Sequence, residues 1–186
     1  MNERHRAFAD AIEPALRGLY AAAVRLTGSS SSANDLVQDT LLLAYQSWER
    51  FDAATNIRAW LHRIQYNAFV SQYRRRKRER ELLSRDATGP EYEPLISEHD
   101  RRCLHDGGIQ RQSLTPTINR ALDRLPQEFR TVVIMADIGE LTYREIADIL
   151  GCPMGTVMSR LHRARRALAK DLQATLSPAE IQAYAA

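Results

Sequence analysis

Residues 141–168, LTYREIADILGCPMGTVMSRLHRARRAL, carry start and stop signals that allow few backbone arrangements. Thr142, followed by Glu145 three positions later, is a capping box, which begins a helix. Gly151 suits the left-handed conformation that ends a helix, and Pro153 is favoured at the first position of the next one. The segment therefore predicts a short helix, a turn of about three residues and a longer helix, which together form a helix-turn-helix.

Apolar spacing predicts which side of the longer helix faces inward. The apolar stripe steps by four, three and four and consists of Val157, Leu161, Ala164 and Leu168. We expect it to pack on the apolar residues of the preceding helix, Ile146, Ile149 and Leu150. The outward side then carries small and polar residues followed by arginines, a composition that fits the major groove of DNA. Taken alone, the arginines could equally form a solvated basic face of a helical bundle.

Residues 81–113 contain Gly-Pro and Gly-Gly breakers and no sustained apolar period, which indicates a flexible linker. The rest of the chain is rich in Ala, Leu, Arg and Glu at helical spacing and has no credible β-hairpin signal. The predicted fold class is all-α, with two small helical domains at residues 8–80 and 114–172. Residues 173–186 form a C-terminal tail.

The first domain is predicted to contain three helices. The first runs from about Phe8 to Leu26, and Ser32 is the expected N-cap of a second helix beginning at Ala33. The expected buried stripe of that second helix is Val37, Leu41, Ala44 and Trp48. The third helix starts at Thr55 or Asn56 and runs into the arginine cluster Arg74, Arg75, Arg76, Lys77 and Arg78; its expected buried residues are Ile57, Leu61, Ile64 and Ala68.

Composition excludes several classes of protein. At 186 residues, 44% hydrophobic and 26% charged, the chain is that of an ordinary globular protein. Its opening, MNERHRAFAD, has no signal-peptide core, and no apolar run approaches the roughly 18 residues of a membrane span, so we expect a cytoplasmic protein without membrane insertion. The net charge of +3 is only a weak indication of nucleic-acid binding.

No feature of the sequence indicates an enzyme or a cofactor. The five histidines are scattered, and there is no Gly-rich phosphate loop. Cys103 and Cys152 are expected to be free thiols. His99, Cys103 and His105 lack a defined fourth ligand, so we expect no metal site.

The segment 141–168 closely resembles region 4 of the extracytoplasmic-function (ECF) sigma factors of bacteria. Three further strings, DLVQDTLLLAYQSW, TNIRAWLHRIQYN and YRRRKR, are similar to region 2 of the same family, in the same order and at the right distance. The resemblance covers nearly all of residues 8–170. The strings TN-x-x-AWL, EFR and GTVMSRLHR are most similar to the branch of the family that answers thiol-oxidative stress.

The resemblance implies roles for three sets of residues. The region 2 face that docks on the clamp helices of the RNA polymerase β′ subunit corresponds to Asp35, Gln38 and Asp39, for which plain solvated helix surface is the alternative. The promoter −10 element would be handled by Phe51, Asn56, His62, Arg63, Asn67, Arg74, Arg75 and Arg76, although Phe51 could equally be a core residue. The −35 element would be read by Tyr143, Arg144, Thr156, Ser159, Arg160, His162, Arg163 and Arg166. Many relatives carry lysine or arginine where Met158 stands, so one base contact could be apolar or absent.

The implied function is that of a dissociable sigma factor, which directs core RNA polymerase to promoters by recognising −35 and −10 elements. Its implied partners are the polymerase core, through the β′ clamp helices and β flap, promoter DNA and an anti-sigma factor. The final SPAEIQAYAA resembles tags recognised by ClpXP-type proteases, so Ala185 and Ala186 are candidates for a degron, and a frayed tail is the alternative. The competing function is a stand-alone helix-turn-helix transcriptional regulator.

Overall fold

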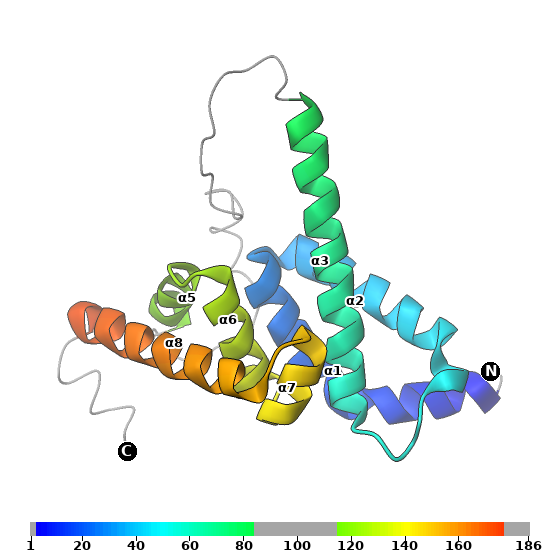
Figure 1. Cartoon of the computed structure of the whole chain (residues 1–186). Coiled ribbons are helices and arrows are strands. Elements are labelled where there is room, and N and C mark those ends of the chain that lie inside the picture. Colours follow the sequence, from blue (N-terminus) through cyan, green and yellow to red (C-terminus); the bar gives the residue numbers. More distant parts are fainter. Residues whose placement is uncertain (1–2, 84–114, 177–186) are drawn as a thin grey trace. The chain divides into compact units, whose positions relative to one another are not determined.

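The computed structural model describes residues 3–83 and 115–176, and every regular element in those ranges is helical (Figure 1). The chain divides into two units, within residues 1–104 and 105–186. The predicted all-α fold class is therefore confirmed. Nearly all of the predicted linker lies outside the described residues, except that helix α3 continues to Leu83.

The first unit is a bundle of three helices, α1 (Glu3–Thr27), α2 (Ser30–Gln46) and α3 (Ile57–Leu83), with a 3₁₀ turn η1 (Trp48–Arg50) after α2. Each helix packs on the other two. The buried core cluster consists of Phe8, Ile12, Ala15, Leu19, Ala44 and Leu61. Figure 1 shows α3 extending well past its two partners, so its basic end lies outside the bundle.

A tight corner joins α1 to α2. Gly28 adopts a left-handed conformation with φ 71°, and its N–H donates to the carbonyl of Val24 at 2.8 Å. Ser29 then caps α2, because its extended backbone lets its side-chain oxygen accept from the N–H of Ser32. The prediction that Ser32 caps a helix starting at Ala33 is wrong. Any serine of this run could cap a helix, and the corner at Gly28 selects the first.

The buried stripe of α2 differs from the predicted one. It consists of Ala33, Leu36, Thr40 and Ala44. Of the predicted residues only Ala44 is fully buried, since Val37, Leu41 and Trp48 are half-buried. The hydroxyl of Thr40 donates to the carbonyl of Leu36 at 2.6 Å, which satisfies a polar group that burial would otherwise penalise. The rotated stripe leaves Leu42 and Leu43 57% and 44% exposed.

The third helix begins at Ile57, one residue after the later of the two predicted starts. Asn56 lies just outside the helix, where its side chain accepts from the N–H of Arg58 at 3.0 Å. Its buried residues differ from the predicted set, of which only Leu61 is fully buried. The others facing the core are His62, Gln65 and Phe69. The amide of Gln65 donates to the carbonyl of Leu19 at 2.8 Å and so ties α3 to α1.

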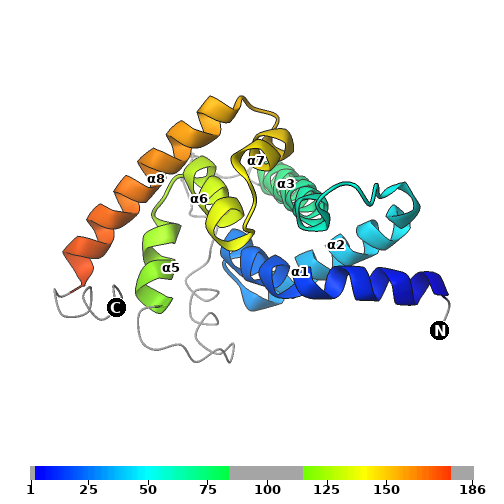
Figure 2. The ribbon, with the colours of Figure 1, turned by 90° about the horizontal axis from the view of Figure 1, so that it is seen from below.

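The second unit contains α5 (Thr115–Asp123), α6 (Gln127–Val133), a π-helical turn η3 (Ile134–Ile138), α7 (Tyr143–Leu150) and α8 (Met154–Thr175). Helix α8 packs on α5, α6 and α7, and Figure 2 shows how the long α8 follows α7 after a short turn. The buried core cluster consists of Leu122, Leu125, Val133 and Ala164. The predicted inward stripe of α8 is confirmed for Val157, Leu161 and Ala164, whereas Leu168 is half-buried.

Helices α7 and α8 form the predicted helix-turn-helix. The N–H of Glu145 donates to the Thr142 hydroxyl oxygen at 3.3 Å, and the N–H of Thr142 donates to the Glu145 carboxylate at 2.8 Å, which completes the capping box. Gly151 is left-handed (φ 62°, ψ 38°) and ends α7. Pro153 occupies the N-cap position of α8, one residue before the predicted one, because its extended ψ of 143° stands outside the helix.

We expect Thr142→Ala to lower the free energy of unfolding of the second unit by about 1 kcal/mol, the usual cost of losing an N-cap side chain. Thr142→Ser keeps the capping oxygen and should keep the stability. Both tryptophans, Trp48 and Trp60, lie in the first unit, so tryptophan fluorescence follows that unit while circular dichroism follows the helices of both. A loss of the same size in Thr142→Ser would contradict the capping role.

Candidate nucleic-acid and polymerase interfaces

The outward face of α8 presents most of the predicted −35 residues. Ser159, His162, Arg163 and Arg166 are exposed, and Thr156 is half-buried. On α7, Tyr143 and Arg144 are also exposed. The predicted face is thus brought together on two consecutive helices.

Two other arginines of α8 are engaged by acids of the same unit. The guanidinium of Arg160 pairs with the carboxylate of Glu128 on α6 at 2.8 Å. Arg165 pairs with Asp137 of η3, and the hydrogen bond to Asp137 raises the pKa of Arg165. Arg163 and Arg166 make no ion pair within the described part of the unit. The sequence therefore predicted the exposed cations correctly but gave no sign that Arg160 has a partner within the unit.

Four of the predicted −10 residues share one face of α3. Asn56 lies at its start, and Arg63, Asn67 and Arg74 follow it at intervals of seven, four and seven positions, which places all four on one side of a helix. All four are exposed, as are Arg75 and Arg76. Arg75 pairs with Glu79 at 2.9 Å along the helix. This side of α3 presents amides near the bundle and cations beyond it.

His62 is separated from this face, because its side chain is only 5% exposed. Burial is the main reason that the pKa of His62 is lowered, and the positive charge of Arg58 lowers it further, while a hydrogen bond with Gln65 acts in the opposite direction. A neutral imidazole inside the bundle is a packing residue. The resemblance to region 2 grouped His62 with Arg63. Neighbouring residues of a helix diverge by about 100°, and here the boundary of the core runs between them.

Phe51 is half-buried within an aromatic cluster. Its ring stacks on Trp48 with centroids 5.3 Å apart and an interplanar angle of 10°, and lies 4.8 Å from the ring of Trp60. Trp48 in turn meets Phe8 of the core edge to face at 5.3 Å. The loop after α2 is therefore anchored to the bundle by stacked rings, and Phe51 as a whole residue is half-buried.

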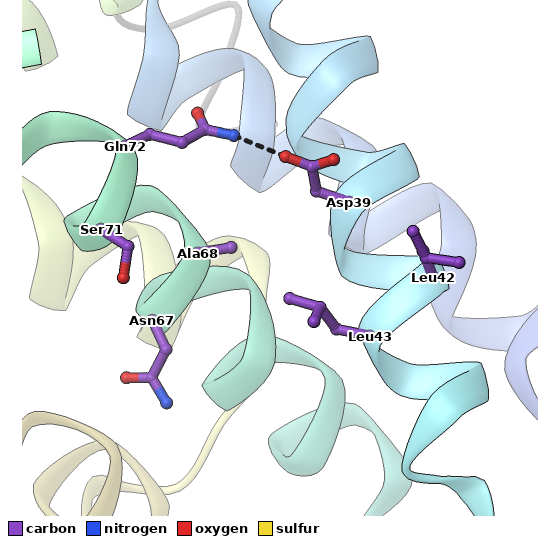
Figure 3. Close-up of a pocket in the computed structure, with 7 residues that line it drawn as sticks. All are labelled: Asp39, Leu42, Leu43, Asn67, Ala68, Ser71 and Gln72. Atoms are coloured by element: carbon purple, nitrogen blue, oxygen red, sulfur yellow. Dashed lines mark hydrogen bonds between the residues drawn. The ribbon is translucent and has the colours of Figure 1, made fainter. Parts of the chain in front are cut away.

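An open groove of about 380 Å³ runs between α2 and α3 (Figure 3). Leu42, Leu43 and Asp39 line it from α2, with Asp39 accepting a hydrogen bond from Gln72 of α3 at 2.9 Å. Asn67 and Ser71 line it from α3. The groove thus joins a predicted polymerase contact, Asp39, to a predicted −10 contact, Asn67.

The outer face of α2 carries two further exposed polar residues beside the groove. Asp35 and Gln38 are exposed and stand one turn before Asp39 and Leu42. Sequence reasoning missed both exposed leucines. The signal that could have found them is the run Leu41-Leu42-Leu43, because three consecutive residues span about 200° of a helix and cannot all face one core.

The predicted degron and the histidines and cysteine of the linker lie outside the described residues. Ala185 and Ala186 of the degron, and the linker residues His99, Cys103 and His105, are not described. Within residues 3–83 and 115–176, no group of three or more His, Cys, Asp or Glu side chains could hold a metal ion. In the same ranges no helix has the length and apolar character of a membrane span.

Comparison with known proteins decides the family. The family model Sigma-70 region 2 matches residues 11–79, and the model Sigma-70, region 4 matches residues 117–168. The ECF RNA polymerase sigma factor SigW of Bacillus subtilis is 31% identical over 171 residues, which are 90% of this chain and 89% of SigW. The chain belongs to the ECF RNA polymerase sigma factors. EcfG of Rhodopseudomonas palustris is 37% identical over 86% of this sigma factor and 81% of EcfG. SigE of Mycolicibacterium smegmatis is also 37% identical, but the match covers only 55% of SigE.

Solved structures agree with this family. The sigma factor RpoE of Bartonella quintana, in complex with the anti-sigma factor NepR, matches with a TM-score of 0.72 and 32% identity over 90% of this chain and 98% of RpoE. CnrH in complex with the cytosolic domain of CnrY matches with a TM-score of 0.62 and 26% identity over 91% of this chain and 90% of CnrH. The predicted sigma factor function is confirmed, and the stand-alone regulator is not favoured.

We expect the first unit to lose stability as the solution is acidified. The folded state lowers the pKa of His62 and so binds a proton less readily than the unfolded state. The contribution of His62 to the free energy of unfolding is therefore fully present above the ordinary histidine pKa of about 6.5, and it is lost as the pH drops below that value. Urea unfolding followed by tryptophan fluorescence, at about pH 7.5 and about pH 5.5, measures this loss. His62→Gln should lose less, and an equal loss in both proteins would contradict a buried neutral His62.

Proposed function

We propose that this sigma factor divides promoter recognition between its units. The first unit binds core polymerase through α2 and the separated −10 strand along α3, and α8 of the second unit reads the −35 duplex. The observation that carries this proposal is the outer face of α2, where Leu42 and Leu43 lie exposed beside carboxylates. A regulator that binds duplex DNA alone has no use for such a face.

The polymerase contact combines charge with apolar area. Asp35 and Gln38 are exposed, and Asp39 borders a groove whose α2 wall is formed by two leucines. Protein interfaces commonly place an apolar centre inside a polar rim. We assign the β′ clamp helices to this face, with the leucines as the centre and the carboxylates steering the encounter. No residues are assigned to the predicted β flap contact.

The −10 contact follows the exposed side of α3. Amide groups of Asn56 and Asn67 can hydrogen-bond base edges, and Arg63 lies between them on the same side. Further along, Arg74, Arg75 and Arg76 provide a cationic track for phosphates. We assign the half-buried Phe51 to stacking on an unpaired base. His62 supports this surface from inside the bundle.

The −35 contact uses the outward side of α8. Arg163 and Arg166 are exposed and make no ion pair within the described part of the unit, so their charge is available to guanine edges or phosphates. Arg160 has a different role, because its pairing with Glu128 holds α8 against α6. Tyr143 and Arg144 on α7 extend the contact to the flanking backbone.

We further infer that an anti-sigma factor regulates this protein by covering the groove between α2 and α3. RpoE and CnrH, which it resembles in structure, were each solved with a partner, and the partner of RpoE, NepR, is an anti-sigma factor. Exposed leucines favour aggregation when the protein is not bound to polymerase. A partner that covers them would prevent this and would also block polymerase binding. Membership of the thiol-oxidative-stress branch, β flap binding and tail proteolysis by a ClpXP-type enzyme remain predictions.

Purified core polymerase with this protein, on a pooled library of genomic promoter fragments, should start transcription at sites that share two spaced elements. We expect Leu42→Asp to abolish these starts, because a charge in the apolar centre of the interface must be desolvated without a partner. Asp35→Lys should weaken core binding through reversed charge. Core binding is measured directly by competition against labelled wild-type protein.

The matched control is Asp10→Lys, which reverses an exposed carboxylate on α1. It should bind core polymerase like the wild type. Equal binding by Leu42→Asp and wild type would contradict the assignment of the clamp helices to this face. Tight binding to duplex DNA without polymerase, with no new start sites, would favour the stand-alone regulator.

Arg163→Ala should weaken holoenzyme binding to promoters that depend on the −35 element and leave core binding intact. If Arg163 binds phosphate, the slope of log affinity against log salt concentration should also fall in magnitude by about one. If it binds a base, the sequence preference at one position should relax instead. Lys170→Ala, which removes an exposed cation near the other end of α8, is the control. Filter binding across a series of salt concentrations distinguishes these outcomes. Unchanged promoter affinity in Arg163→Ala would contradict the role assigned to α8.

A further inference from the structure

Two methionines lie exposed at the start of α8. Met154 and Met158 are 51% and 50% exposed, and their spacing of four residues stacks them on one side of the helix. The other large apolar side chains that are exposed in the described ranges are Leu42, Leu43 and Tyr143. The methionine pair is thus a small apolar surface at the end of the helix that meets the turn.

The surroundings of the pair carry positive charge. His162 continues the same side of the helix four residues after Met158, and Arg163 lies next to it. Arg163 and Arg166 make no ion pair within the described part of the unit. An apolar protein partner would have to leave these cations without an acceptor, whereas DNA provides phosphates and base acceptors beside them. The charge around the pair therefore favours a nucleic-acid ligand.

Gly155 lies between the two methionines and has an open side. A Cβ at this position would meet no atom within 4 Å, and the backbone is not in the left-handed region. Nothing inside the described fold therefore requires glycine here, although glycine lowers helix stability relative to alanine. The missing side chain leaves room for a ligand to approach the helix beside Met154 and Met158.

On the basis of the function proposed above, we propose that Met154 and Met158 select thymine in the −35 element by packing against its 5-methyl group. That methyl is the one apolar group that a base pair presents in the major groove. A thioether side chain is apolar, has no hydrogen to donate and bends to fit an irregular surface. Arg163 and Arg166 then supply charge-based affinity and guanine contacts, and the methionines discriminate thymine from cytosine.

Replacing single thymines of the −35 element by uracil tests this directly, because uracil lacks only the methyl group. The promoters are those identified with the pooled library, and the complex is core polymerase with the full-length protein. At one or more positions, uracil should weaken wild-type binding by about fourfold, the effect of exposing one buried methyl group. Met158→Ala or Met154→Ala should abolish the uracil penalty at its own position, and Met158→Leu should retain it. Lys170→Ala should keep every uracil penalty.

Three results would overturn the inference while the sigma function stands. These are a −35 element without thymine on either strand, wild-type binding that is indifferent to uracil at every position, and uracil penalties that persist in both alanine variants. If core polymerase with the wild-type protein gave no promoter-specific starts at all, that result would instead overturn the proposed function together with the inference. The salt dependence of binding should stay unchanged in the methionine variants, because no charge is removed.

Discussion

The inward packing of Val157, Leu161 and Ala164 fixes the direction of every other side chain on α8. These residues are fully buried, and a rigid helix turns by about 100° per residue. Once they face the core, Arg163 and Arg166 must face away from it. The acids of α6 and η3 then engage Arg160 and Arg165 at the flanks. Apolar burial thus divides the arginines of α8 into two that pair with acids of the same unit and two that are exposed without an ion pair in the described residues, as the proposed −35 contact requires.

The same constraint shapes the first unit through α2. Burial of Leu36 and Thr40 turns Leu42 and Leu43 outward, onto the side that also carries Asp35 and Asp39. The stripe is narrow because two of its four residues are alanines, which allow close approach of α1 and α3. An exposed apolar surface of two leucines is small for a folded protein. It would still contribute binding free energy when a partner covers it.

Local signals in the sequence were sufficient for the helix-turn-helix. Thr142, Glu145 and Gly151 act through their own backbone neighbours, so their positions alone determine where α7 begins and ends. The cap of α2 and its buried stripe depended on contacts with distant residues and were predicted incorrectly. Burial of His62 and pairing of Arg160 with Glu128 are likewise set by which helices meet. The sequence therefore predicted which helices form and which of them carry exposed charged residues. It did not predict which residues of each helix are buried and which are exposed.

Helix α3 has 27 residues, a length of about 40 Å, and Arg74, Arg75 and Arg76 near its far end are exposed. Packing cannot keep this end helical, and the pair between Arg75 and Glu79 contributes only a few tenths of a kcal/mol. Repulsion among neighbouring cations works against the helix as well. Phosphates would remove that repulsion, so promoter DNA should increase the helicity of α3, and part of the binding energy is spent on ordering it. In the proposed −10 contact, the affinity of this sigma factor would therefore be coupled to a local helix–coil equilibrium, which temperature and salt would shift together.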